Sequence, residues 1–142
     1  MAEELEMTWA EYCARNRSRC EIEAGTLQKH LLKLQNGDHR SLACHFMFFN
    51  DTKGNLQILE GTLSQNYKTE LLEQENGKYW TVECSDSPVS IDAIVEKYSL
   101  KWVGEMCTLA EKCGCTFSSW TFIDLDTREI WSNSGVPNSP AG

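Results

Sequence analysis

The sequence predicts an α+β fold, a mainly antiparallel sheet with N-terminal helices and one long helix packed on it. Apolar residues recur with helical spacing near the N-terminus and again after Ser90. Between these regions, Asn76-Gly77 separates two β-prone segments and is the strongest short hairpin signal in the chain. We expect a single domain over residues 1–131 and a flexible, proline-containing tail over residues 132–142.

Two helices are predicted near the N-terminus. Thr8-Trp9-Ala10-Glu11 has the pattern of a capping box, so a first helix should begin near Trp9. A second helix is predicted from Thr26 to Gln35, because its leucines form one helical stripe. Asn36-Gly37-Asp38 follows as a stop signal.

The sheet is predicted to begin at Ser41, where the pattern changes from helical to extended. Residues Cys44 to Phe49 carry apolar side chains on both faces, which is typical of a central strand. A turn over Asn50 to Asn55 and a returning strand over Leu56 to Leu63 are expected next. With the strands around Asn76-Gly77, they would form an antiparallel meander of about four strands.

A long amphipathic helix is predicted from Ser90 to Cys113. Ser90 is a suitable N-cap, and the apolar residues that follow recur at spacings of three and four. Gly114 is a natural left-handed stop. Beyond it, Cys115 to Ile123 predicts a strand, and a turn then leads into Ile130-Trp131.

The charge balance of the chain disfavours some classes of partner. Asp and Glu number 21 against 13 Lys and Arg, which gives a formal net charge of −8. A field of this sign opposes general binding to nucleic acids and to anionic membranes, but it is compatible with a basic protein partner. We expect no membrane association, since the apolar runs are too short for a membrane helix.

The cysteines predict a reducing compartment. There are seven, without the regular spacing of a disulfide framework, and several fall within apolar patterns as reduced thiols do. The N-terminus is acidic where a secretory or mitochondrial signal would be basic. A cytoplasmic location is therefore expected, with the nucleus as the alternative.

Metal binding has one candidate sequence. Cys113-Gly114-Cys115 can chelate a metal if Cys107, Cys44 or His45 approach it. Structural zinc sites normally bring paired cysteine or histidine knuckles, which are absent from the sequence, so a helix end and strand start that bury small thiols is the favoured explanation of the pair. We predict neither a metal nor a cofactor.

No catalytic residues are predicted. A cysteine nucleophile needs a histidine nearby, and only His30, His39 and His45 are available. Asp124-Leu125-Asp126 is either a cation ligand pair or, more commonly, an aspartate-rich turn. Ser118-Ser119 lacks the glycines of a nucleophile elbow, and no phosphate-binding glycine loop occurs. A reactive thiol stays open.

Two sets of residues are candidates for binding a partner. Tryptophan is enriched among interface hot spots and is seldom fully buried, although core packing is the alternative for each ring. Arginines in the first helix form the main basic concentration, either an RNA contact or a solvated helical face. The candidates are Trp80, Trp120 and Trp131 for a protein partner, and Arg15, Arg17 and Arg19 for a nucleic acid.

A further pattern lies between Ser90 and Asp124. It comprises Ser90-Ile91-Asp92-Ala93, then Glu105 to Lys112, and finally Trp120 and Asp124. This pattern resembles the last helix and strand of the RraB family of ribonuclease E regulators. The resemblance implies a small, acidic, cytosolic α+β protein that acts by binding an enzyme.

The sequence therefore predicts a non-enzymatic regulatory or inhibitory protein that binds another macromolecule. The grounds are the lack of a catalytic pattern, the small size, the acidic charge and the surplus of tryptophan. Three alternatives stay open. They are a small enzyme or ligand-binding domain with a cleft hidden from sequence, an acidic client chaperone that would form a symmetric homodimer, and an RNA-binding module.

Overall fold

The computed structural model describes residues 8–35 and 40–133, and within them it confirms the predicted α+β fold. The α-helices are α2 (Trp9–Gln35), α3 (Lys53–Leu63), α4 (Ile91–Lys97) and α5 (Leu100–Lys112). The strands are β1 (Ser41–Asn50), β2 (Lys68–Gln74), β3 (Tyr79–Ser85), β4 (Val89–Ser90), β5 (Thr116–Ile123) and β6 (Ile130–Ser132). In these residues, none of the helices has the length and apolar character needed to span a bilayer.

The strands form one antiparallel sheet in the order β2-β3-β1-β5-β6, and β4 pairs with the start of β1. From β1 to β5 the chain has the βαββαβ connectivity of ferredoxin-like proteins, with α3 and α5 as the main crossover helices. The expected meander is therefore wrong, because β1 lies between β3 and β5. The central position expected for this strand is confirmed.

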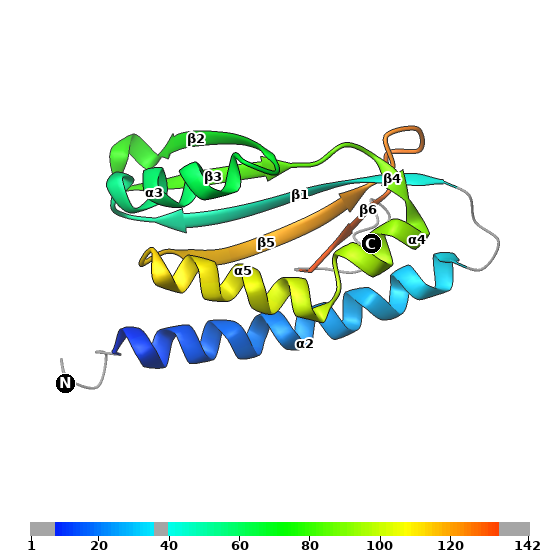
Figure 1. Ribbon diagram of the computed structural model, residues 1–142, viewed down its shortest axis with the longest axis horizontal. Coiled ribbons are helices and arrows are strands. Elements are labelled where there is room, and N and C mark those ends of the chain that lie inside the picture. The colour runs from blue at the N-terminus through cyan, green and yellow to red at the C-terminus, as the bar shows by residue number, and fades with distance from the viewer. Residues whose placement is uncertain (1–7, 36–39, 134–142) are drawn as a thin grey trace.

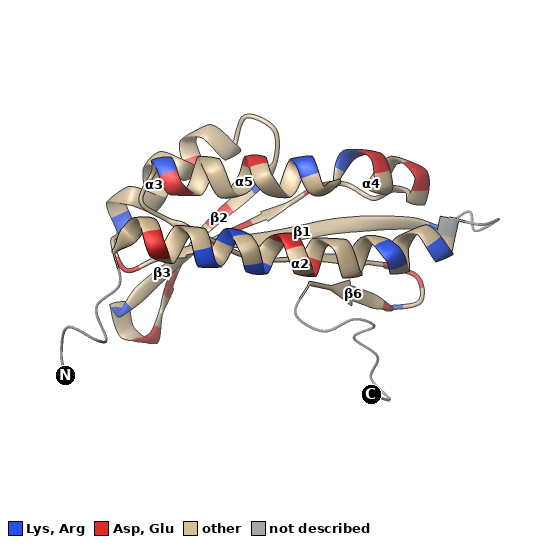
Figure 2. Ribbon diagram, turned by 90° about the horizontal axis from the view of Figure 1, so that it is seen from below, with Lys and Arg blue, Asp and Glu red and all other residues tan. Residues whose placement is uncertain are grey.

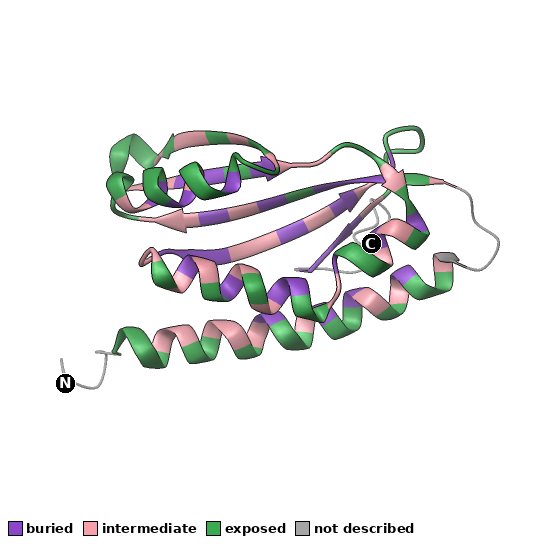
Figure 3. Cartoon of the chain, in the orientation of Figure 1, coloured by how far each residue is buried: buried purple, intermediate pink, exposed green. Residues whose placement is uncertain are grey.

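One face of the sheet is covered and the other is open. Helices α3 and α5 lie on the covered face, and α2 runs beside α5 along the border of the sheet (Figure 1). The even-numbered residues of β1 from Leu42 to Phe48 are buried beneath the helices, whereas His45, Met47 and Phe49 point to the open face. Figure 3 shows this alternation of buried and more exposed residues along the strand.

Helix α2 replaces the two helices expected at the N-terminus. Cys20, Ala24, Leu27 and Leu31 are buried at spacings of three and four, so one apolar stripe runs through the expected gap. Burying this stripe outweighs the helix-weakening effect of Gly25, which is about 1 kcal/mol relative to alanine. The predicted stop at residues 36–38 lies outside the described residues.

The strand expected over residues 56–63 is wrong, since this segment lies in helix α3. Leu56, Leu59 and Leu63 are buried, and their spacings of three and four match a helical stripe. The long helix expected after Ser90 is also interrupted, because Tyr98 has a non-helical backbone between α4 and α5. This break lets the Tyr98 hydroxyl donate to the Asp86 carboxylate at 2.8 Å.

Several local signals are confirmed. The Glu11 amide donates to Thr8 Oγ1 at 3.1 Å, and the Thr8 amide donates back to Glu11 Oε1 at 3.4 Å, as in a capping box. Ser90 accepts from the Ala93 amide at 3.3 Å, which makes it the N-cap of α4. The Asn76-Gly77 pair lies in the turn of the hairpin between β2 and β3.

A β-bulge in β5 fills the core. Phe48 pairs with Phe117 and Met47 with Ser119, so Ser118 is an extra residue in this strand. Residues three apart in a regular strand point to opposite faces, but across the bulge Phe117 and Trp120 are both buried. Their rings stack with centroids 5.1 Å apart and extend the aromatic core.

Asn133, the last residue that the structure describes, contacts two other elements. Its side-chain oxygen accepts from the Trp120 amide at 2.8 Å, and its amide group donates to Glu23 Oε1 at 2.7 Å. It thus joins the end of β6 to β5 and to α2. The rest of the expected tail, residues 134–142, lies outside the described residues.

Replacing each of two glycines by alanine should change the stability of the fold in opposite directions. Gly114 has a φ of +71°, and an added Cβ would lie 3.1 Å from Asn55 Nδ2, so Gly114→Ala should destabilise by about 1–2 kcal/mol. Gly25 is helical with no atom within 4 Å of an added Cβ, so Gly25→Ala should stabilise by about 0.5–1 kcal/mol. Urea unfolding measures both changes. A change in the same direction for both variants would contradict the left-handed backbone at Gly114 or the helical backbone at Gly25.

Candidate functional site

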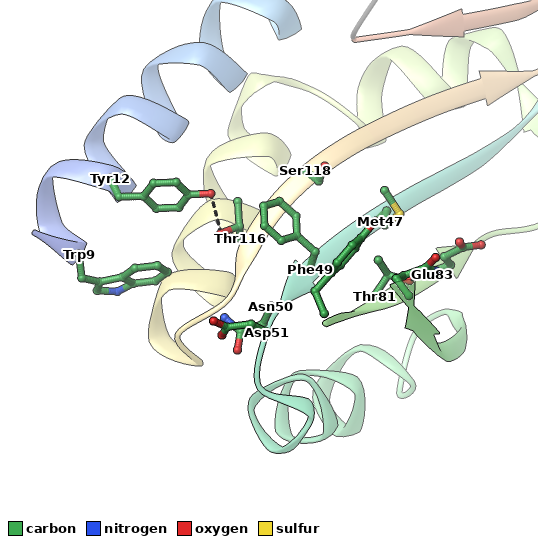
Figure 4. A pocket seen from close by; sticks show the side chains of 12 residues that line it. Trp9, Tyr12, Met47, Phe49, Asn50, Asp51, Thr81, Glu83, Thr116 and Ser118 are labelled. Atoms are coloured by element: carbon green, nitrogen blue, oxygen red, sulfur yellow. Dashed lines mark hydrogen bonds between the residues drawn. The ribbon is translucent and has the colours of Figure 1, made fainter. Parts of the chain in front are cut away.

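A large hollow lies on the open face of the sheet, beside the N-terminal end of α2. Its volume is about 1130 Å³. We call it the sheet groove (Figure 4). Its lining residues come from α2, from the strands β1, β2, β3 and β5, and from the turn after β1: Trp9, Tyr12, Met47, Phe49, Asn50, Asp51, Gln74, Tyr79, Thr81, Glu83, Thr116 and Ser118.

The floor of the sheet groove follows from strand alternation and register. Met47 and Phe49 are two apart in β1, so both point to the open face. The register places Glu83 opposite Met47, and it places Thr81 opposite Phe49. Directly opposed side chains share one face of a sheet, so aromatic, apolar and polar groups are grouped here without help from any loop.

The wall of the sheet groove is the first turn of α2. The rings of Trp9 and Tyr12 stack with centroids 5.5 Å apart. The Thr116 hydroxyl donates to the Tyr12 hydroxyl at 3.0 Å, which fixes this turn against β5 (Figure 4). Trp9 is 44% exposed, a large value for tryptophan. The wall therefore presents an exposed aromatic surface on a helix whose position is fixed by a hydrogen bond to β5.

The charged groups that line the sheet groove are all acidic. They are Asp51 and Glu83, and no lysine or arginine is among the lining residues. Glu70 lies directly opposite Glu83 in the pairing of β2 with β3. The two glutamates thus form an acidic pair at the edge of the sheet groove. Like charges at directly opposed positions repel each other and destabilise the fold.

A second, smaller hollow of about 480 Å³ includes His45, Lys68 and Asp86 in its lining. Asp86 accepts hydrogen bonds from Lys97 Nζ and from the Tyr98 hydroxyl. Burial raises the pKa of Asp86, but these donors and the Ser87 amide outweigh it, so the pKa lies below its usual range. The carboxylate is thus ionised and paired at neutral pH, which makes it unsuited to transferring protons.

The thiols are mostly held in the protonated form. All seven cysteines are free, and burial raises the pKa of Cys84 and of Cys115 to about 12. Cys107 differs, because a hydrogen bond from Cys20 lowers its pKa against the effect of burial. Its side chain is only 2% exposed, so access of a substrate to this sulfur is blocked.

The aspartates at the end of β5 form a turn. Asp124 Oδ1 accepts from the amides of Asp126 and Thr127 at 2.9 and 3.2 Å. This geometry is an aspartate-rich turn, the commoner of the two structures that the sequence allows here. Among the described residues, no group of three or more His, Cys, Asp or Glu side chains is placed to hold a metal ion.

The tryptophans expected to bind a partner lie elsewhere than at the sheet groove. Trp120 is 1% exposed and Trp131 is 6% exposed, so both are core residues, and the exposed platform expected of them is not found. Trp80 is half-buried on the helix side of the sheet, with the Lys53 ammonium 4.8 Å from its ring centroid. Trp9, which the sequence predicts only as the start of a helix, lines the sheet groove.

The three arginines expected to contact nucleic acid differ in their exposure and in their hydrogen-bond partners. Arg15 is exposed. Arg17 donates to Gly104 O at 3.2 Å and to Thr108 Oγ1 at 2.9 Å, and it pairs with Glu111, which joins α2 to α5. Arg19 donates to Phe117 O and Ser118 O of β5. Figure 2 shows the arginines of α2 as one basic stretch bounded by acidic residues, and the contacts of Arg17 and Arg19 with α5 and β5 leave Arg15 as its exposed member.

Searches against protein-family models, curated proteins and solved structures give no match for this chain. The resemblance to the RraB family therefore stays a prediction.

Proposed function

We propose that this chain is a regulatory protein that binds another protein through the sheet groove. The observation that carries the proposal is a hollow of about 1130 Å³ lined by aromatic rings on a helix and on strands. Sites built on helices and strands are positioned more precisely than sites on loops. Aromatic residues are also the side chains most enriched at protein interfaces.

The composition of the lining supports binding rather than bond-breaking chemistry. Covalent catalysis pairs a nucleophile with an adjacent base, commonly histidine or lysine. The lining of the sheet groove contains four aromatic rings but no cysteine, histidine or lysine. The lining does hold the carboxylates of Asp51 and Glu83, but the Thr116 hydroxyl donates to Tyr12 and the Thr81 hydroxyl accepts from Gln74.

The size of the hollow supports a macromolecular partner. Pockets for small molecules typically measure about 300–1,000 Å³ and enclose most of the ligand. The sheet groove exceeds that range and lies on the open face of the sheet, where Trp9 is 44% exposed. Such a shape suits several side chains of a partner segment laid across strands and helix.

A capture experiment tests this function. The full chain is immobilised, exposed to nuclease-treated lysate of its source cells, and compared with Trp9→Ala and with Ile58→Ala. Ile58 is 67% exposed on α3, away from the groove lining, and serves as the matched apolar control. We expect a protein in equimolar amount on the wild type and on Ile58→Ala, reduced at least about tenfold on Trp9→Ala, as for a hot-spot tryptophan. Equal capture by all three would place the binding surface elsewhere.

A further inference from the structure

We infer that the segment held in the sheet groove is a basic peptide of the partner, with a lysine or arginine next to a bulky apolar residue. This inference rests on the proposed function and specifies the chemistry of the partner. It starts from charge. The charged lining residues are Asp51 and Glu83, and both are exposed.

These carboxylates are available to a partner. Ion pairs join other acids of the chain, such as Glu111 with Arg17 and Asp86 with Lys97. Within the described residues, Asp51 and Glu83 have no lysine or arginine within ion-pairing distance. Glu70, opposite Glu83, adds a third negative charge at the edge of the groove. A cation bound there would relieve repulsion between the two glutamates, which a neutral segment would leave in place.

The aromatic rings favour the same chemistry. Trp9 and Tyr12 stack at the wall, and Phe49 and Tyr79 meet edge to face at 6.5 Å on the floor. Lysine and arginine lay their apolar stems on such rings and are attracted electrostatically to the ring faces. Met47, which lies opposite Glu83 and two residues before Phe49, offers an adaptable surface to an apolar neighbour.

Other occupants match the sheet groove less well. Residues 1–7 of this chain carry three glutamates and no lysine or arginine, so they would add charge of the same sign. Residues 134–142 also have no basic side chain. A nucleic acid would bring phosphates toward Asp51 and Glu83. Of these occupants, a basic peptide alone complements both the charge and the rings.

A peptide selection tests the inference. A phage library of random 12-residue peptides is selected on the full chain, and enriched peptides are synthesised and measured by fluorescence anisotropy. We expect enriched peptides to carry net positive charge and at least one bulky apolar residue. Their affinity should fall about tenfold with Glu83→Lys and with Trp9→Ala, and it should weaken as salt is raised.

Matched controls separate the local charge from the net charge. Glu96→Lys makes the same change of charge on α4, outside the groove lining, and should leave affinity within about twofold. Glu83→Gln should give a smaller loss than Glu83→Lys. Circular dichroism and urea unfolding verify that each variant is folded.

Two adverse results can be told apart. Peptides that depend on Trp9 but are neutral or acidic would overturn the basic segment and leave the proposed function standing. Selection of no peptide that depends on Trp9 would overturn both, because the sheet groove would then not be a peptide-binding surface.

Discussion

Replacing Trp120 by alanine should lower the free energy of unfolding by about 3–5 kcal/mol. The ring is 1% exposed and stacks on Phe117 at 5.1 Å, so truncation leaves a cavity within the aromatic core. A domain of ordinary stability has about 5–15 kcal/mol in total, so the variant should lose a large share of its stability, and a domain near the lower limit would be close to unfolding. Urea unfolding followed by circular dichroism measures the change.

Trp9→Ala is the matched control, since it removes the same side chain from the surface. It should cost less than about 1 kcal/mol, mainly the stacking with Tyr12. The two variants thus separate a tryptophan that stabilises the fold from one that is placed to bind. A loss of under 1 kcal/mol for Trp120→Ala would contradict the core assignment.

Replacing Arg19 by methionine should cost about 1.5–3 kcal/mol, the usual range for hydrogen bonds to a charged group. The guanidinium donates to Ser118 O at 3.1 Å and pairs with Glu23 at 2.6 Å. Without it, the Ser118 carbonyl at the edge of β5 loses its donor from α2. Phe117 O keeps the side-chain amide of Asn16 at 3.0 Å, which limits the loss.

Arg15→Met is the control for this prediction. It removes the same charge from the same helix, but Arg15 is exposed, so stability should change by less than about 0.5 kcal/mol. Thermal unfolding of the two variants side by side gives the difference. Equal stability would mean that the contacts of Arg19 with β5 contribute nothing to the fold.

The parts of the fold that follow from neighbouring residues could be predicted from the sequence. The Thr8–Glu11 capping box and the Ser90 cap join residues three apart, and the left-handed turn at Gly114 depends on one residue. Helix α3 could not be recognised in this way. Leu56 and Ile58 alternate as in a short strand, whereas Leu56, Leu59 and Leu63 have helical spacing, and the burial of the leucines against β1 and β3 favours the helix.

The sheet groove could be predicted only in part. Alternation along β1 places Met47 and Phe49 on one face, and this was expected. The wall depends on the hydrogen bond between Thr116 and Tyr12, residues 104 apart in the sequence, so no local pattern could place Trp9 there. No sequence pattern predicts the bulge at Ser118 either. This bulge lets Phe117 and Trp120 both be buried in the core.

The contacts of α2 with β5 have a consequence for self-assembly. Side chains of α2 donate hydrogen bonds to the carbonyl oxygens of Phe117 and Ser118 at the edge of β5. The rest of this edge of the sheet is the three-residue strand β6. In the described part of the molecule, β2 is the one longer strand with an unpaired side. Fibrous growth by strand addition needs two receptive edges on each copy. Any backbone pairing between copies through β2 would therefore close at two chains and could not propagate.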